Sequence, residues 1–240
     1  MKGLFLNHIK LNGIKQMQLD RFLLEKSITN PAITLIARFY SWEGNWISFG
    51  KNQLSIPPKW EEISRRENVK FVRRPSGGDA VIHKGGITYS IIWSNPPIKK
   101  KEAYFQASKW IINGFKEIGI SLNFGSELQK KQQNCFSTST SADLVDNKGN
   151  KRVGSAQYWK NKHLLQHGEI LFEPSEKLWE LFFDESAPKL ERISLTTSQV
   201  EKILTKSIKS YWKDLEWDHI NINFEEIFNK NKSNLNCYLI

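Results

Sequence analysis

"VKFVRRPSGGDAVIHKGGITYSIIW", residues 69–93, is the stretch that decides the fold prediction for this chain of 240 residues. Its ends are rich in β-branched and aromatic residues. Between them lie two runs of turn-forming residues, PSGG at 75–78 and KGG at 84–86. We therefore expect a strand, a glycine loop, a second strand, a turn and a third strand.

Helices are expected on both sides of this stretch. Residues 13–27 carry apolar side chains at helical spacing, and so do residues 103–119 and the segment SEKLWELFF at 175–183. A further helix is expected to open within the segment TSQVE, where Ser198 and Glu201 have the spacing of a capping box.

Strands are expected at residues 32–40 and 45–53. The first of them alternates, so that four apolar residues share one side: Ile33, Leu35, Ala37 and Phe39. Residues 132–172 should hold three more β segments, joined at the polar turns DNKGN (146–150) and KNKH (160–163).

The order of these elements indicates the fold class. Strands and helices are interspersed without a strict βαβ rhythm, which predicts an α+β fold with a mixed, largely antiparallel sheet flanked by helices. No internal repeat and no low-complexity linker divides the chain, so we expect residues 1–240 to form a single domain.

Composition limits the possible partners and compartments. The net charge of +10 favours anionic partners such as nucleic acid, a membrane surface or an acidic protein. The lysines are scattered, however, so a compositional bias explains the charge equally well. Residues 1–13 do not have the pattern of a signal peptide, and no apolar run reaches 18 residues. We expect a soluble cytoplasmic protein.

The two cysteines, Cys135 and Cys237, are too few for a disulfide framework. Each is therefore either a small buried hydrophobic residue or a reactive thiol.

The glycine loop is the first candidate for chemistry. Ser76-Gly77-Gly78 lets the backbone approach a ligand closely, because glycine carries no side chain. The flanking Arg73 and Arg74 offer paired donors for a phosphate or a carboxylate. The alternative is an ordinary tight hairpin with arginines at its solvated end.

Two further segments have a similar character. NKRVGSAQYW, residues 150–159, places a small-residue loop directly after Lys151, and LLQHGEILF places His167 and Gly168 between apolar strand residues. A histidine within a strand is either a hydrogen-bonded core residue or a catalyst. Each of the three segments could have an ordinary structural role. Each combines small residues with a basic or titratable side chain, however, and this common pattern favours one shared binding site.

Five segments in order resemble the biotin/lipoate A/B protein ligase family: QMQLDRFLLE, RFYSWEGNWISFGKNQ, VRRPSGGDAVIHKGGITYSII, KRVGSAQ and LQHGEILF. They span roughly residues 10 to 185. The resemblance implies a fold like that of class II aminoacyl-tRNA synthetases and biotin ligases. It also implies a tunnel for a medium-chain acyl group, and attack on that group by the lysine of a lipoyl domain or of a glycine-cleavage H protein.

Within this family the chain is most similar to the cysteine-dependent octanoyltransferases, which accept octanoate from octanoyl-acyl carrier protein. A Cys-Phe pair precedes KRVGSAQ in that branch, as Cys135 and Phe136 do here, and its cysteine is the nucleophile. The resemblance gives Lys151 the role of stabilising the thiolate. Chemistry agrees, because the DNKGN turn can bring the two side chains together and an adjacent ammonium favours the thiolate that attacks a thioester.

The resemblance implies catalytic roles for Cys135 and Lys151, no metal and no cofactor, and no nucleic-acid or membrane partner. The alternative activities are those of an ATP-dependent lipoate–protein ligase or a lipoyl-domain amidotransferase. The substrate-binding residues that it implies are Arg73, Arg74, Ser76, Gly77, Gly78, Ala80, His83, Gly154, Ser155, Ala156, Gln157, His167 and Gly168.

Overall fold

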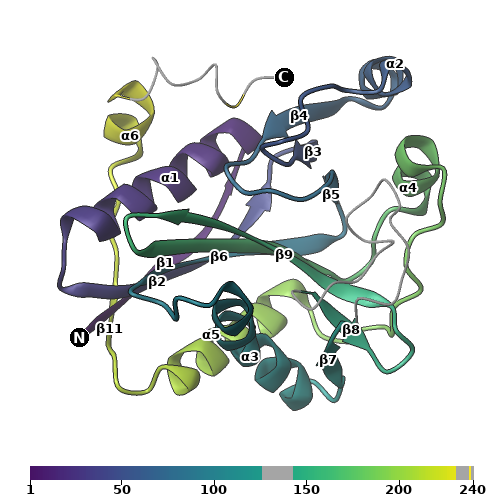
Figure 1. Ribbon diagram of the computed structural model, residues 1–240. Helices are drawn as coiled ribbons and strands as arrows, with labels where there is room; N and C mark the ends of the chain where they lie inside the picture. The colour runs from purple at the N-terminus through teal and green to yellow at the C-terminus, as the bar shows by residue number, and fades with distance from the viewer. Residues whose placement is uncertain (126–142, 231–237, 239–240) are drawn as a thin grey trace.

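The computed structural model of the chain describes residues 1–125, 143–230 and 238. Within these residues the strands form one large and one small sheet (Figure 1). The large sheet consists, in spatial order, of β11 (Glu216–His219), β1 (Lys2–Leu11), β2 (Ile33–Trp42), β6 (Gly86–Ser94), β10 (His163–Leu171), β9 (Lys151–Lys160), β8 (Leu144–Asp146) and β7 (Leu122–Phe124). The small sheet consists of β4 (Val69–Arg73), β3 (Asn45–Phe49) and β5 (Val81–His83).

Helices cover both faces of the large sheet (Figure 1). On one face α1 (Gly13–Thr29) packs against β2, β6 and β10, and α6 (Phe224–Lys230) contacts α1. On the other face α3 (Lys100–Glu117) and α5 (Thr197–Tyr211) pack against each other. The small sheet is accompanied by α2 (Pro58–Glu67) and α4 (Glu176–Phe183). None of the helices in the described part of the chain is long and apolar enough to cross a membrane.

The strand pairing is mixed but largely antiparallel. The run β2-β6-β10-β9-β8-β7 is antiparallel throughout, whereas β1 pairs in parallel with both β2 and β11. The expected α+β architecture is therefore confirmed. The segment 132–172 was expected to hold three β segments, and within its described part these are β8, β9 and β10, joined at the predicted turns.

A bulge in β2 corrects the expected alternation of that strand. Lys2 lies opposite Ile33 and Gly3 lies opposite Leu35, so Thr34 is an extra residue in the ladder. Because side chains alternate with a period of two, one extra residue moves Ile33 to the other face. It packs in the cluster beneath α1, while the alternating residues from Leu35 onward face α3 and α5.

The N-cap residue of helix α5 is Thr196, two residues before Ser198, which was the expected N-cap. The side chain of Thr196 accepts a hydrogen bond from the Gln199 backbone N–H at 3.3 Å, and the Gln199 side chain accepts one from the Thr196 backbone N–H at 2.9 Å. The predicted box of Ser198 and Glu201 was therefore wrong. The Glu201 carboxylate instead contacts His8 Nδ1 at 2.7 Å and so ties α5 to β1.

Candidate active site

A cavity lies where α1, the small sheet and the centre of the large sheet meet. We call it the central cavity. Met17, Tyr40 and Trp42 supply apolar and aromatic wall. Eight of the predicted site residues also line it: Arg74, His83, Lys151, Gly154, Ser155, Ala156, His167 and Gly168. Segments about 150 positions apart in the chain, from Met17 to Gly168, therefore contribute to one site.

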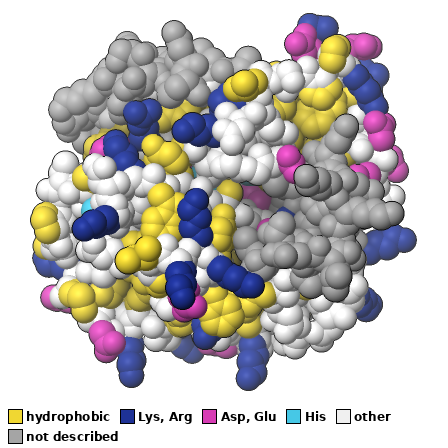
Figure 2. Space-filling model, viewed as in Figure 1, with side chains coloured by type: hydrophobic (Ala, Val, Ile, Leu, Met, Phe, Trp, Pro, Cys, Tyr) yellow, Lys and Arg dark blue, Asp and Glu magenta, His cyan; other side chains and the backbone are white. Residues whose placement is uncertain are grey.

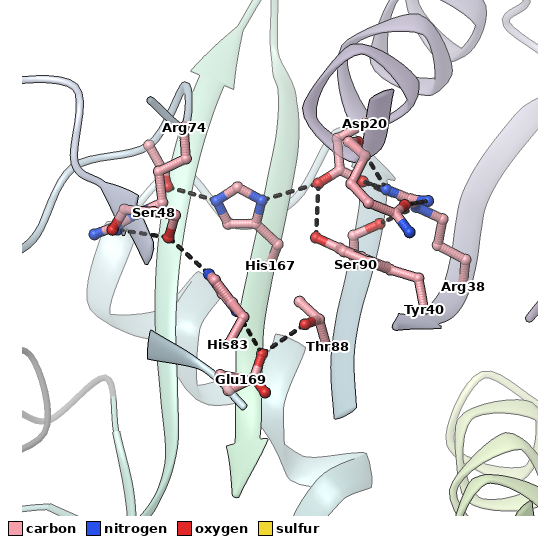
Figure 3. A network of polar contacts seen from close by, with 12 residues as sticks. Asp20, Arg38, Tyr40, Ser48, Arg74, His83, Thr88, Ser90, His167 and Glu169 are labelled. Carbon is pink, nitrogen blue, oxygen red and sulfur yellow. Dashed lines mark hydrogen bonds and ion pairs between the residues drawn. The ribbon is translucent and has the colours of Figure 1, made fainter. Parts of the chain in front are cut away.

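A buried ion pair fixes one side of this cavity. The Asp20 carboxylate of α1 lies 2.6 Å from the Arg38 guanidinium of β2, and both side chains are almost fully buried (Figure 3). Burial raises the pKa of Asp20, but Arg38 and His167 outweigh burial and hold that pKa at about 2. Asp20 is therefore an anion at any physiological pH.

His167 joins this anion to the glycine loop. Its Nδ1 lies 2.9 Å from Asp20 Oδ2, and its Nε2 lies 2.5 Å from the Ser76 hydroxyl (Figure 3). A carboxylate can only accept, so Nδ1 donates to Asp20. In the neutral imidazole, Nε2 then accepts the Ser76 hydroxyl proton. Ser76 is fully buried, and its role in this arrangement is to hold the loop.

His83 belongs to a second chain of polar contacts. Its Nδ1 lies 2.8 Å from Glu169 Oε2, and its Nε2 lies 2.8 Å from the Ser48 hydroxyl (Figure 3). The ring stacks on Trp42 with centroids 3.9 Å apart. Burial lowers the pKa of His83, and the nearby Glu169 carboxylate opposes this shift without cancelling it. The neutral imidazole therefore predominates at neutral pH.

The two arginines before the glycine loop hold backbone carbonyls. Arg74 is buried and donates to the carbonyl oxygens of Ser48, Gly77 and Asp79, at 2.9, 2.7 and 2.7 Å. Arg73 Nη1 donates to the carbonyl oxygens of Gly50 and Gln53. The sequence suggested that both arginines meet a ligand. In the structure their N–H groups also bind backbone carbonyl oxygens of the loop after β3 and of the glycine loop, and these contacts fix the shape of both loops.

The glycines permit close backbone packing around the cavity. A Cβ atom on Gly50 would lie 1.8 Å from the Gly78 carbonyl oxygen, and one on Gly168 would lie 2.4 Å from the Gly154 carbonyl oxygen. Gly78 also has φ +87, which favours glycine. Gly77 has free space around its Cβ position. Gly50 and Gly168 are therefore required by close backbone contacts, and Gly78 is favoured by its positive φ.

Lys151 lies in the central cavity, where its Nζ is 2.9 Å from Asp143 Oδ2. Both side chains are about 95% buried. Asp143 was not predicted as a site residue, because the sequence placed it in the turn that precedes Lys151. Cys135, the predicted nucleophile, lies outside the described residues, and so does Cys237.

Six of the predicted residues that the structure describes do not line the central cavity. Three of them, Ser76, Gly77 and Gly78, belong to the glycine loop, in which Ser76 contacts His167. The other three are Ala80, Gln157 and Arg73. Ala80 is fully buried in the cluster of the small sheet with α2 and α4. Gln157 donates to Gln166 Oε1 at 2.8 Å and accepts from Trp159 Nε1 at 3.0 Å. Arg73 lines a neighbouring cavity instead.

Several polar residues of the site were not predicted from the sequence. Asp20, Arg38 and Glu169 stand inside apolar runs that were read only as helix or strand. A charged residue on a buried face was the available signal, because such a group needs a buried partner. The identity of that partner depends on the fold.

Comparison with known proteins tests the predicted family. The model for the lipoyl protein ligase A/B catalytic domain matches residues 12–228. Octanoyltransferase LipM of Carboxydothermus hydrogenoformans is 32% identical over 200 residues, which cover 79% of this chain and 72% of that protein. Octanoyltransferase LipM of Bacillus subtilis is 34% identical over 191 residues, which cover 74% of this chain and 68% of that protein.

Solved structures show the same fold. Lipoate-protein ligase A bound with ATP matches with a TM-score of 0.74 and 15% identity, covering 96% of this chain and 94% of that chain. A bipartite lipoate protein ligase of Thermoplasma acidophilum, studied with its E2 lipoyl domain, matches with a TM-score of 0.70 and 16% identity, covering 96% and 92%. These likenesses concern the fold alone. On the family match and its sequence relatives, the chain is an enzyme that belongs to the lipoyl protein ligase A/B catalytic domain family.

Proposed function

We propose that this chain is an octanoyltransferase of protein lipoylation, which moves octanoyl from octanoyl-acyl carrier protein to the lysine of a lipoyl domain or H protein. The observation that carries the proposal is Lys151, which begins β9 and is a buried ammonium in the wall of the central cavity. The octanoyltransferase relatives, at 32% and 34% identity over most of the chain, support it.

The proposed reaction has two steps. The Cys135 thiolate attacks the octanoyl thioester, the carbon–sulfur bond to the carrier breaks, and the carrier thiolate leaves and takes a proton from solvent. The acceptor lysine amine then attacks the new thioester, loses a proton and forms an amide, which regenerates the Cys135 thiolate. Residues 1–240 would act as one catalytic domain.

The described residues support three parts of this reaction. The aromatic and aliphatic wall of the central cavity suits an eight-carbon chain. The Lys151 ammonium is positioned to stabilise negative charge on a thiolate or on the carbonyl oxygen, and Asp143 compensates the ammonium in the resting enzyme. Backbone amides near Gly77, Gly78 and Gly154 are candidates for holding the developing oxyanion.

An ATP-dependent lipoate–protein ligase is the second candidate, because the solved structures with this fold are lipoate ligases. A ligase activates a free acid through an acyl-adenylate and needs no cysteine nucleophile. An amidotransferase between lipoyl domains would need the cysteine but would use an acylated domain as donor. The two alternatives therefore differ from the proposal in ATP dependence and in the donor.

Intact-protein mass spectrometry after mixing the enzyme with octanoyl-carrier protein, without ATP, tests the proposal. We expect one octanoyl group on the parent enzyme, released by hydroxylamine. Cys135→Ser should remove both the adduct and the transfer. Cys237→Ser is the matched control, because it removes the other cysteine of the chain, and it should retain both. Full transfer by the Cys135→Ser variant, or an absolute need for ATP, would assign the chain to the ligases.

A further inference from the structure

A second cavity adjoins the central one and shares Arg74 with it. It lies between α1, the loop after β3 and the outer half of the β9–β10 hairpin. Leu24, Tyr158 and Leu165 supply apolar and aromatic wall. We call it the basic cavity, after the four cationic side chains that line it.

These cations come from three separate segments. Arg21 projects from α1, Lys51 from the loop after β3, and Arg73 and Arg74 from the end of β4. Glu25 also lines the cavity, but its carboxylate forms an ion pair with Lys160. Four cations against one paired carboxylate give the cavity a positive potential, which favours an anionic ligand.

Lys51 occupies a defined place in this arrangement. Its backbone N–H donates to the Ser76 carbonyl oxygen at 2.8 Å, which fastens the loop to the glycine loop. Its Nζ lies 5.9 Å from the centre of the Tyr158 ring. Arg73 holds the same loop from the other side through the Gly50 and Gln53 carbonyl oxygens. The Lys51 ammonium therefore lies in the wall of the basic cavity, near Tyr158.

The space-filling view agrees with this charge distribution. Lysine and arginine side chains are interspersed with hydrophobic ones on the face toward the viewer, and several gather over the region of α1 (Figure 2).

The distance from the reacting centre limits which anion fits. Tyr158 follows Lys151 by seven residues along β9, which corresponds to about 23 Å at 3.3 Å per residue. In an acyl-adenylate the phosphate is bonded to the acyl carbonyl group, so it would lie beside Lys151. A phosphate bound near Tyr158 must instead be joined to the carbonyl through a long arm.

We propose that the basic cavity binds the phosphate ester of the donor's phosphopantetheine arm while the acyl chain occupies the central cavity. This rests on the proposed function, which places the thioester carbonyl at Lys151. The Lys51 ammonium is a suitable donor for a phosphate, and the Tyr158 ring offers a contact surface for the arm. Arg73 and Arg74 donate to backbone carbonyl oxygens and add positive charge to the cavity. The cavity would thus recognise the donor by a group remote from the bond that breaks.

Two small donors test the proposal without a carrier protein: octanoyl-pantetheine and octanoyl-4′-phosphopantetheine. The readout is the ratio of their kcat/KM values in each enzyme, so that a general loss of activity cancels. We expect the parent to prefer the phosphorylated donor about tenfold, mainly through KM. Lys51→Gln should lose most of this preference. Lys116→Gln, an exposed change on α3, should keep it.

Binding measurements separate the possible failures. Phosphopantetheine should bind the parent in calorimetry and bind Lys51→Gln about tenfold more weakly. Equal kcat/KM for the two donors in the parent, or equal binding by both enzymes, would overturn the phosphate site and leave the transferase intact. If AMP, and not phosphopantetheine, binds in a Lys51-dependent way, the cavity is a nucleotide site and the proposal is wrong. Failure of both thioesters to react without ATP would refute the proposed function, while the binding result would still decide whether the cavity holds phosphopantetheine.

Discussion

Replacing Asp20 with asparagine removes the carboxylate from a buried ion pair and leaves the Arg38 guanidinium without its counter-charge. Both side chains are at most 1% exposed, and their closest contact is 2.6 Å. Removing one partner of a buried ion pair costs about 3–5 kcal/mol, because the remaining charge is desolvated. We expect Asp20→Asn to lose that much free energy of unfolding. Urea titration followed by tryptophan fluorescence measures the loss.

The exposed pair of Lys59 and Asp184 is a matched control for this prediction. It has the same closest contact of 2.6 Å, but its side chains are 52% and 75% exposed. Asp184 has φ +55, which asparagine also tolerates, so Asp184→Asn changes the charge alone. It should cost less than about 1 kcal/mol. If the two variants lose similar free energies, burial does not determine the strength of these pairs and the reasoning is wrong.

Three further predictions concern stability. The Asp20 pKa of about 2 lies below the ordinary 3.8, so the parent should lose about 2 kcal/mol as the pH falls from 4 to 2; urea curves should show that Asp20→Asn lacks this loss. Gly50→Ala brings a Cβ against a carbonyl oxygen and should cost about 1–3 kcal/mol, whereas Gly77→Ala, with open space, should stay within about 0.5 kcal/mol; thermal unfolding of both variants checks this. Thr196→Ala should cost about 1 kcal/mol and Ser198→Ala about half of that or less in the same assay, and the reverse order would restore the rejected capping box.

The fold could be predicted where local pattern and tertiary packing agree. The helix at residues 13–27 and the turns of the β9–β10 region follow from periodicity and turn residues. β1 was missed because Asn7 and His8 are exposed and interrupt its apolar pattern. α2 buries only Trp60 and Ile63, which is too weak a periodicity to recognise.

The register of β2 was beyond a sequence-based prediction for a different reason. The extra residue at Thr34 is visible only against β1, a strand more than twenty residues away. The same limit applies to the site. Of the three predicted small-residue loops, only the glycine loop is a loop, because residues 154–157 lie within β9 and residues 167–168 lie within β10. The pairing of Asp143 with Lys151, and of Asp20 with both Arg38 and His167, depends on which strands become neighbours.

The backbone contact between Gly50 and Gly78 couples the loops beside the two cavities. The loops that carry Lys51 and Ser76 touch through main-chain atoms with no space for a side chain between them, so neither loop can shift without displacing the other. A ligand that orders one loop lowers the entropic cost of ordering the second. By thermodynamic reciprocity, any factor by which a phosphate in the basic cavity tightens acyl binding must equal the factor by which the acyl chain tightens phosphate binding. A free fatty acid and a free phosphopantetheine should therefore bind cooperatively even when no bond joins them.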